Sequence, residues 1–290
     1  MRAVNAFGRW SQPAIPASRL ARLGVIAYLF VPLDMLFANR WIALHGQVPS
    51  RLYQPVMIAR LLNLPTPTMF WVNLIQVLTV GAALSACAVM LAKRRVPVAL
   101  DRTLRAIVPI GYLWWMFVAM SYGKVDHDRI GYITLLIALA CVPRLAAHDH
   151  TPDTQSGWLL RMVQISVMAT YFLAAFAKVR FGGWAWMNGA TLSRAVIRRG
   201  TYWSNWLIEK PGILRASQWA ILWGEFLSPA IFFIRRKRTI VITVFCLFGF
   251  HLMTFMALRI VFLPHCVALC SFLPLEDIRL RTRSMTSNVA

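Results

Sequence analysis

The sequence predicts an all-α protein, a polytopic helical membrane bundle with about eight transmembrane helices plus interfacial helices. Of its 290 residues, 59% are hydrophobic and only 14% are charged, and the mean hydropathy is +0.59. The charged residues cluster between long apolar runs, which a soluble enzyme does not show. Because spans and short connectors use up the chain, we expect residues 1–290 to form one transmembrane domain with no sizeable soluble domain.

The first expected span covers residues 20–38. Four arginines lie at its N-terminal side, a pattern that resembles a signal sequence, but the apolar run continues through Pro32 and Asp34 without a small-x-small cleavage site. We therefore predict an uncleaved span. Residues 39–68, which contain LHGQVPSRLY and the proline pair Pro65 and Pro67, predict a re-entrant or interfacial segment on the far side of the membrane.

Short polar connectors separate the remaining apolar runs. Residues 179–215 are rich in Trp and Arg, with Glu209 as the only acid, and this composition is typical of an amphipathic helix in the membrane interface. The other expected spans are residues 69–92, 104–122, 130–146, 158–178, 216–234, 239–258 and 260–273.

The basic connectors indicate the orientation. The positive-inside rule places residues 93–105, residues 235–238 and the C-terminal tail in the cytoplasm. Both termini are then cytoplasmic, with tails of residues 1–19 and roughly the last 15 residues, in a multi-pass protein of the cell membrane. The turn at residues 123–129 lies outside. The basic segment 179–215 is also expected outside, where the positive-inside rule disfavours basic residues. The rule applies less strictly if this segment lies on the membrane surface.

The net charge of +21 does not indicate nucleic-acid binding, because the basic residues flank apolar segments and form no compact basic domain. Membrane lipids are the expected partners of these charges. All five cysteines fall within apolar runs and are expected to be small buried hydrophobes. Cys266 and Cys270 are one helical turn apart, which is too weak a pattern to predict metal or redox chemistry, and we predict no metal.

The stretch from Tyr171 to Gly189, YFLAAFAKVRFGGWAWMNG, is the strongest candidate for function. Tyr171, Ala174 and Lys178 share one helix face, and a Gly-Gly, Trp-rich turn follows. A lysine at the edge of hydrocarbon usually faces a bundle interior, a cavity or the headgroups. The alternative is a lysine that snorkels to its own interface.

Ionisable residues of separate helices are expected to meet Lys178. In the expected topology, His127 and His251 lie toward the outer side and Glu225 lies near the middle of its span, so these residues could share one outward-facing cavity. Each of these residues could instead have a purely structural role. In that case His251 and Glu225 orient neighbouring helices, and His127 is an ordinary loop residue. Asp34 is expected to pair with Arg40 or another basic group.

Four segments resemble the vitamin K-dependent gamma-carboxylase transmembrane domain, also called the HTTM domain. YFLAAFAK followed by Trp184 and Gly189 is similar to that family's YF-A-G-x-x-K…W-x-x-G motif. FHLMTFMALRIVFLP, from Phe250 to Pro264, is similar to its FH-x-M-N…F-P segment. DHDRIGY, with His127, resembles the family's histidine before the fourth span, and Asp34 with LHGQVPSRLY resembles the family's first span and following G-x-x-P.

The resemblance implies a carboxylase-like enzyme of the lyase or ligase type with a reduced quinone, such as vitamin K or menaquinol, as cofactor. Lys178 would be the base, with His251 and His127 as further catalytic residues. Trp184, Tyr171 and Phe250 would contact the cofactor. The sequence departs from the family at Thr254, where the family has Asn, and at Ala175, where it has Gly, and one extra residue separates Lys178 from Trp184. No part of the chain resembles the large luminal domain of the animal carboxylase.

Three functions remain open. The first is a quinol-dependent carboxylase-like enzyme that modifies a small molecule or a secreted peptide at the outer face. The second is a non-catalytic membrane partner in the maturation, export or immunity of a secreted peptide. A small transporter is the third, and it ranks last because the two halves show no internal repeat.

Overall fold

Helices carry nearly all of the chain, as the apolar runs predict. The computed structural model describes residues 2–92, 96–123 and 127–278. The all-α prediction is confirmed, since the only strands in the described part, β1 and β2, are two residues each and pair antiparallel. The elements are α1 (Arg2–Ser11), β1 (Ile15–Pro16), α2 (Ala17–Pro32), η1 (Leu33–Ala38), η2 (Arg40–Gln47), η3 (Ser50–Leu52), α3 (Met57–Leu61), α4 (Met69–Leu91), α5 (Val98–Ser121), η4 (His127–Arg129), α6 (Ile130–Cys141), β2 (Pro152–Asp153), α7 (Thr154–Gly182), η5 (Trp184–Asn188), α8 (Ala190–Arg199), η6 (Asn205–Glu209), α9 (Pro211–Leu227), η7 (Ser228–Phe233), α10 (Lys237–Leu258), α11 (Leu263–Leu269), η8 (Cys270–Phe272) and η9 (Leu275–Asp277).

Five helices of the described chain are long and apolar enough to cross a membrane. They are Ala17–Ala38, Met69–Leu91, Val98–Ser121, Thr154–Gly182 and Lys237–Leu258. Each coincides with an expected span, so a multi-pass membrane protein is supported. A helix of about 20 residues rises roughly 30 Å, which matches the hydrocarbon core of a bilayer.

The other three expected spans are shorter helices, and prolines account for this. Val142, just before Pro143, is extended, because the proline ring disfavours helical geometry in the preceding residue, and Pro264 lies in the first turn of α11. Pro229 lies where α9 gives way to the 3-10 turn η7. As a result α6 has 12 residues, α9 has 17 and α11 has 7. The count of eight spans therefore stays a prediction.

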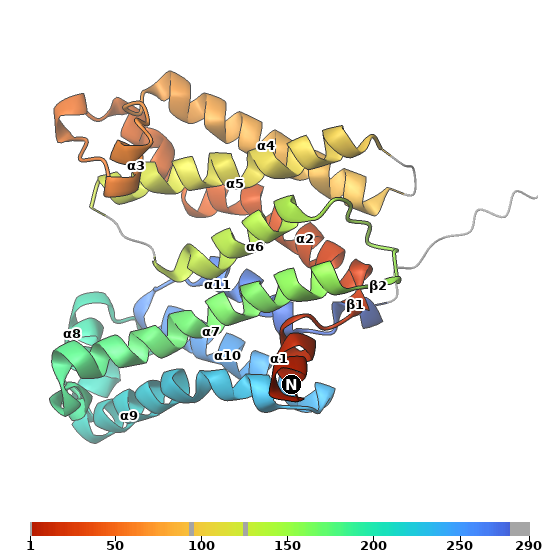
Figure 1. Cartoon of the computed structure of the whole chain (residues 1–290). Coiled ribbons are helices and arrows are strands. Elements are labelled where there is room, and N and C mark those ends of the chain that lie inside the picture. The colour runs from red at the N-terminus through yellow and green to blue at the C-terminus, as the bar shows by residue number, and fades with distance from the viewer. Residues whose placement is uncertain (1, 93–95, 124–126, 279–290) are drawn as a thin grey trace, which may run out of the picture.

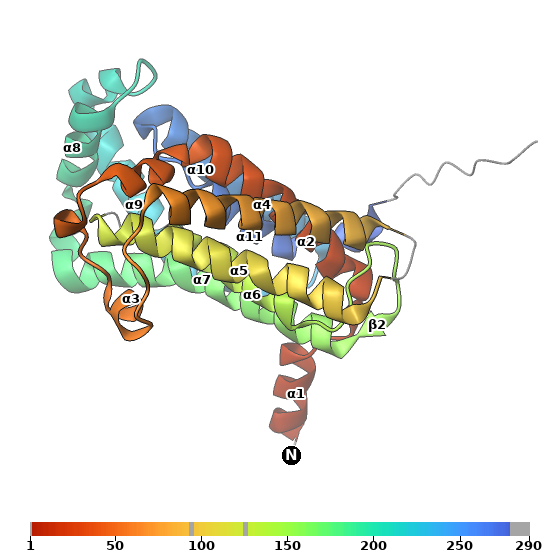
Figure 2. The same ribbon diagram turned by 90° about the horizontal axis from the view of Figure 1, so that it is seen from above.

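The helices run between two ends of the molecule (Figures 1 and 2). At one end, here called the strand end, lie β1, β2 and η9. At the other, here called the α8 end, lie η2, α3, η5 and α8. At the strand end, Lys237 Nζ donates to Asp277 3.2 Å away, and Arg22 donates to the carbonyl oxygens of Ala147 and Leu275. The segments that we predict to be cytoplasmic thus gather at one end.

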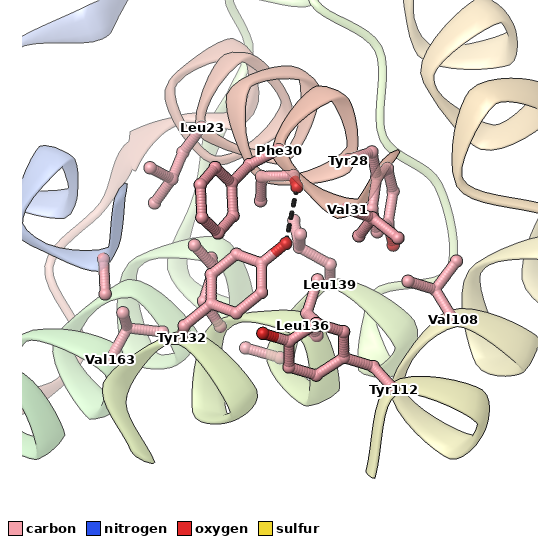
Figure 3. Close-up of a cluster of buried hydrophobic side chains, with 14 of the residues drawn as sticks. Leu23, Tyr28, Phe30, Val31, Val108, Tyr112, Tyr132, Leu136, Leu139 and Val163 are labelled. Atoms are coloured by element: carbon pink, nitrogen blue, oxygen red, sulfur yellow. Dashed lines mark hydrogen bonds between the residues drawn. The ribbon is translucent and has the colours of Figure 1, made fainter. Parts of the chain in front are cut away.

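The buried core joins α2, α5 and α6 (Figure 3). The Tyr132 hydroxyl donates to the Ala27 carbonyl at 2.7 Å, and its ring meets those of Phe30 and Tyr112 edge-on at centroid distances of 5.3 and 5.2 Å. All three rings are almost completely buried. A hydroxyl bond to a main-chain oxygen fixes the ring, so these aromatic residues hold three helices in one arrangement.

A buried ion pair explains why α5 begins six residues before the expected span. Arg105 is fully buried and donates to both carboxylate oxygens of Asp101, one turn earlier, and to the carbonyl oxygens of Leu139 and Pro143. The sequence pattern placed these two charged residues in a connector. In the fold, the guanidinium instead satisfies the carbonyls at the end of α6, and the pair lies inside the bundle.

The two irregular segments form short helices at the α8 end. Within residues 39–68 these are η2, η3 and α3, and within residues 179–215 they are η5, α8 and η6. The break that we predicted after Lys178 comes at Gly183, whose φ of +61° ends α7 in a conformation that glycine adopts most readily. Location in the membrane interface stays a prediction.

Candidate functional site

Lys178 lies in the last two turns of α7, near the α8 end, and its ammonium pairs with the Glu225 carboxylate of α9. The two side chains are 22% and 12% exposed, so the pair is largely enclosed. The ammonium also lies 5.4 Å from the ring centroid of Trp186. The expected meeting of Lys178 with Glu225 is therefore present. An adjacent carboxylate favours the charged form of a lysine, which a neutral base has to overcome.

Tyr171, two turns before Lys178 on α7, bonds to His251 of α10. The hydroxyl and the His251 Nε2 are 2.6 Å apart. His265 of α11 completes a cluster, with its ring 4.7 Å from Tyr171 and 5.4 Å from His251 between centroids. Both histidines are buried, and neither His251 Nδ1 nor either His265 nitrogen has a hydrogen-bond partner among the described residues.

A cavity of about 1050 Å³ lies against this cluster. His127 and His251, which the sequence predicts to converge, both line it. Its walls come from α2, η4, α8, α10 and α11, and most of them are apolar. The lining residues are Phe30, Asp34, Ala38, Asn39, His127, Asp128, Arg129, Arg199, Phe248, His251, Leu252, Phe255, Arg259, Ile260, Val261, Phe262, Leu263, Pro264, Cys266, Val267 and Cys270.

The remaining predicted site residues lie around the cavity, not in its wall. Tyr171 reaches it only through His251, and Phe250 packs on the His251 ring at 5.2 Å. Lys178 is linked to it through Glu225, which interacts electrostatically with His127. Trp184 is 63% exposed and stacks on Trp219 at 6.5 Å, away from the cavity. The predicted cofactor contact of Trp184 therefore has no counterpart among the lining residues.

Asp34 forms the polar wall of the cavity on the side of α2. Its carboxylate accepts hydrogen bonds from Arg129 at 2.5 and 3.2 Å, from the Tyr112 hydroxyl at 2.7 Å and from the Asn39 side chain at 2.7 Å. The basic partner is thus Arg129 and not Arg40. Asp34 and Arg129 are only 1% and 4% exposed, and the pair ties η1 to η4.

Sequence reasoning missed three members of this arrangement, namely His265, Arg129 and Tyr112. Arg129 stands in the quoted DHDRIGY segment, and a buried acid expected in the first span requires a cation, so that signal was present. His265 lies in an apolar run just as His251 does. Tyr112 carried no signal, because a tyrosine in a span is more often a packing residue.

The arrangement can bind a partly polar, largely apolar molecule and exchange protons with it. Imidazoles can accept and donate protons, and both His127 and His251 line the cavity. Among the described residues, no group of three His, Cys, Asp or Glu side chains is placed to hold a metal ion.

Comparison with family models, with curated proteins and with solved structures gave no match. The resemblance to the carboxylase membrane domain therefore rests on the four sequence segments.

Proposed function

We propose that the protein is a membrane enzyme that uses a quinol in the cavity between α2, α10 and α11, and that its reaction is of the carboxylase type. The observation that carries the proposal is the Tyr171–His251 hydrogen bond beside this cavity. It joins the two most specific segments of the resemblance, 80 residues apart in the sequence.

The cavity suits a quinol on three counts. Its volume of about 1050 Å³ is at the upper end of the range for small-molecule sites. Its apolar walls suit an isoprenoid chain. At its polar side, the His127 and His251 side chains offer hydrogen-bond partners to ring oxygens. When bound, a quinol supplies the electrons that reduce O2 and, with them, a base strong enough to remove a weakly acidic C–H proton so that CO2 can add.

The residues of the chain would orient and exchange protons in this proposal. His251, held by Tyr171, would hydrogen-bond to a hydroxyl in the cavity. Lys178 would act as a base only when Glu225 carries the shared proton of the pair, because a base needs the neutral amine.

The experiment is quinol turnover by the purified chain in lipid nanodiscs. Supplied with reduced menaquinone and O2, the protein should consume both in a stoichiometric reaction, and His251→Gln should reduce the rate by about 100-fold or more. Cys141→Ala, an exposed position away from the cavity lining, is the control and should leave the rate unchanged. Equal turnover by His251→Gln and the unaltered protein contradicts the proposal.

One observation favours the second candidate, a non-catalytic membrane partner for a secreted peptide. The Lys178–Glu225 ion pair links α7 to α9 and accounts for a lysine at this position without any chemistry. In that case the protein neither binds nor consumes quinol. A peptide should then copurify with the protein from membranes, and its recovery should depend on an intact α8 end.

A further inference from the structure

The mouth of the cavity carries two arginines that have no partner in the described part of the chain. Arg199 ends α8, and Arg259 follows α10 directly. Both line the cavity, and no hydrogen bond or ion pair with described residues engages either guanidinium. Because no acidic side chain of the described chain neutralises either guanidinium, an anion that binds both would stabilise this arrangement.

The chain holds the two arginines together by capping the end of α10. The Thr201 hydroxyl donates to the Met256 carbonyl at 2.5 Å, and the Ser204 hydroxyl donates to the Ala257 carbonyl at 2.6 Å. Val196 of α8 and Leu258 of α10 are buried in one small cluster. The position of Arg199 relative to Arg259 is therefore fixed by buried contacts on both sides.

Arg259 adopts a backbone conformation that is costly for it. Its φ is +54°, the left-handed region that glycine fills at most helix ends. A non-glycine residue there costs about 1–2 kcal/mol. An arginine at this point places a cation at the negative end of the α10 dipole and at the cavity mouth.

An apolar stripe leads from Arg259 along α10. The stripe consists of Phe248, Leu252 and Phe255, and Arg259 continues it. Successive members are four, three and four residues apart, which puts them on one helix face, and all of them line the cavity. Leu252 is 61% exposed and Phe255 is 45% exposed. The stripe is long enough for part of an acyl chain, and it ends at the two charges.

The charge of residues 179–215, which include Arg199, also favours an anionic ligand. Residues 179–215 carry six basic residues and one acid, although we expect this segment on the side where the positive-inside rule disfavours basic residues. Binding of anionic lipid headgroups explains such an excess, since each basic residue near an anionic surface contributes about 1 kcal/mol.

We propose that Arg199 and Arg259 bind the phosphate of an anionic phospholipid, whose acyl chain lies along Phe248, Leu252 and Phe255. The site lies along the α8 and α10 walls of the cavity in which we propose the quinol, but it goes beyond the quinol chemistry and does not depend on it. A lipid fits better than a free phosphate because the apolar stripe adjoins the charges. Zwitterionic lipid fits less well because its choline would lie against the guanidiniums.

The test is native mass spectrometry of the detergent-purified full chain with dioleoylphosphatidylglycerol or dioleoylphosphatidylcholine, without quinol. We expect selective retention of phosphatidylglycerol. The double variant Arg199→Gln/Arg259→Gly should weaken it by roughly five-fold for each arginine. Glycine suits the φ of residue 259, so this variant should fold. Arg198→Gln removes a neighbouring exposed charge outside the lining and is the matched control.

Three results would overturn the site. The first is equal retention of the two lipids. The second is an equal loss of phosphatidylglycerol in Arg198→Gln and in the double variant. The third is displacement of phosphatidylglycerol by millimolar inorganic phosphate, which would make this a site for free phosphate. Because quinol is absent, each outcome is independent of quinol turnover, and failure of the turnover experiment leaves this site intact.

Discussion

The ammonium of Lys178 and the carboxylate of Glu225 form an ion pair between α7 and α9, 47 residues apart in the sequence. The sequence predicts that Lys178, at the outer end of its span, and Glu225, near the middle of another span, could share one cavity, and the structure brings them into contact. The pair gives Lys178 a role in holding the helices, which can be separated by experiment from the proton exchange that we propose for it.

Lys178→Arg separates these roles. Arginine keeps a positive charge beside Glu225, so thermal stability in detergent should stay within a few degrees of the unaltered protein. A guanidinium keeps its proton at physiological pH, so quinol turnover should be lost if Lys178 is the base. Full turnover in Lys178→Arg would rule out the base and leave the membrane-partner function in the lead.

Removal of one charge should cost more stability than removal of both. Glu225→Gln or Lys178→Met alone leaves an unpaired, largely enclosed charge and should destabilise the fold by about 1–3 kcal/mol. The double variant should recover most of this loss. Thermal unfolding of all four proteins in one detergent gives the coupling energy, and additive losses would show that the pair contributes nothing.

Hydropathy predicted where the long spans lie, because the cost of burying charge in hydrocarbon acts on every residue of a span. It could not predict that Asp101 and Arg105 lie inside the bundle, since a pattern of charges does not tell whether they pair within the protein. The convergence of His127 and His251 followed from alternating topology. The separation of Trp184 from the cavity depends on side-chain packing after Gly183, which no periodicity encodes.

Tyr171→Phe should destabilise the protein by about 1–2 kcal/mol, because the buried His251 then has no hydrogen bond from either ring nitrogen. Ring packing on His265 is retained, so the effect isolates one hydroxyl. Tyr28→Phe is the matched control, since the Tyr28 hydroxyl is buried and has no partner in the described chain. A loss of melting temperature in Tyr28→Phe as large as in Tyr171→Phe would contradict the assigned bond.

Asp34→Asn should destabilise the protein by about 3–5 kcal/mol, since it leaves the buried Arg129 guanidinium without its carboxylate. Because Arg129 also lines the cavity, quinol binding should weaken in the same variant. Arg40→Gln, which removes the exposed arginine close to Asp34 in the sequence, should have little effect. A larger loss of melting temperature in Arg40→Gln than in Asp34→Asn would assign the ion pair to Arg40.

Gly111→Ala should weaken the packing of α4 on α5. A Cβ at Gly111 would lie 1.9 Å from the Thr79 hydroxyl oxygen, which is itself held by the Ile75 carbonyl. Overpacking of this kind costs about 1–3 kcal/mol. Gly81→Ala on α4 has no atom within 4 Å of the new Cβ and should be neutral or stabilising, because alanine favours a helix. Equal melting temperatures for the two variants would place the helices farther apart than the structure has them.

The two ends of the bundle should face opposite sides of the membrane, with the strand end in the cytoplasm. Single cysteines at Tyr202, which is 87% exposed at the α8 end, and at Pro152, which is exposed at the strand end, test this in a chain whose five native cysteines are replaced by alanine. In intact cells a membrane-impermeant maleimide should label Tyr202→Cys alone, and permeabilised cells should label both. The positive-inside rule is the reason, since the basic residues 96–105 and 235–238 lie at the strand end. Labelling of Pro152→Cys alone in intact cells would invert the orientation, and labelling of both would contradict the alternating arrangement.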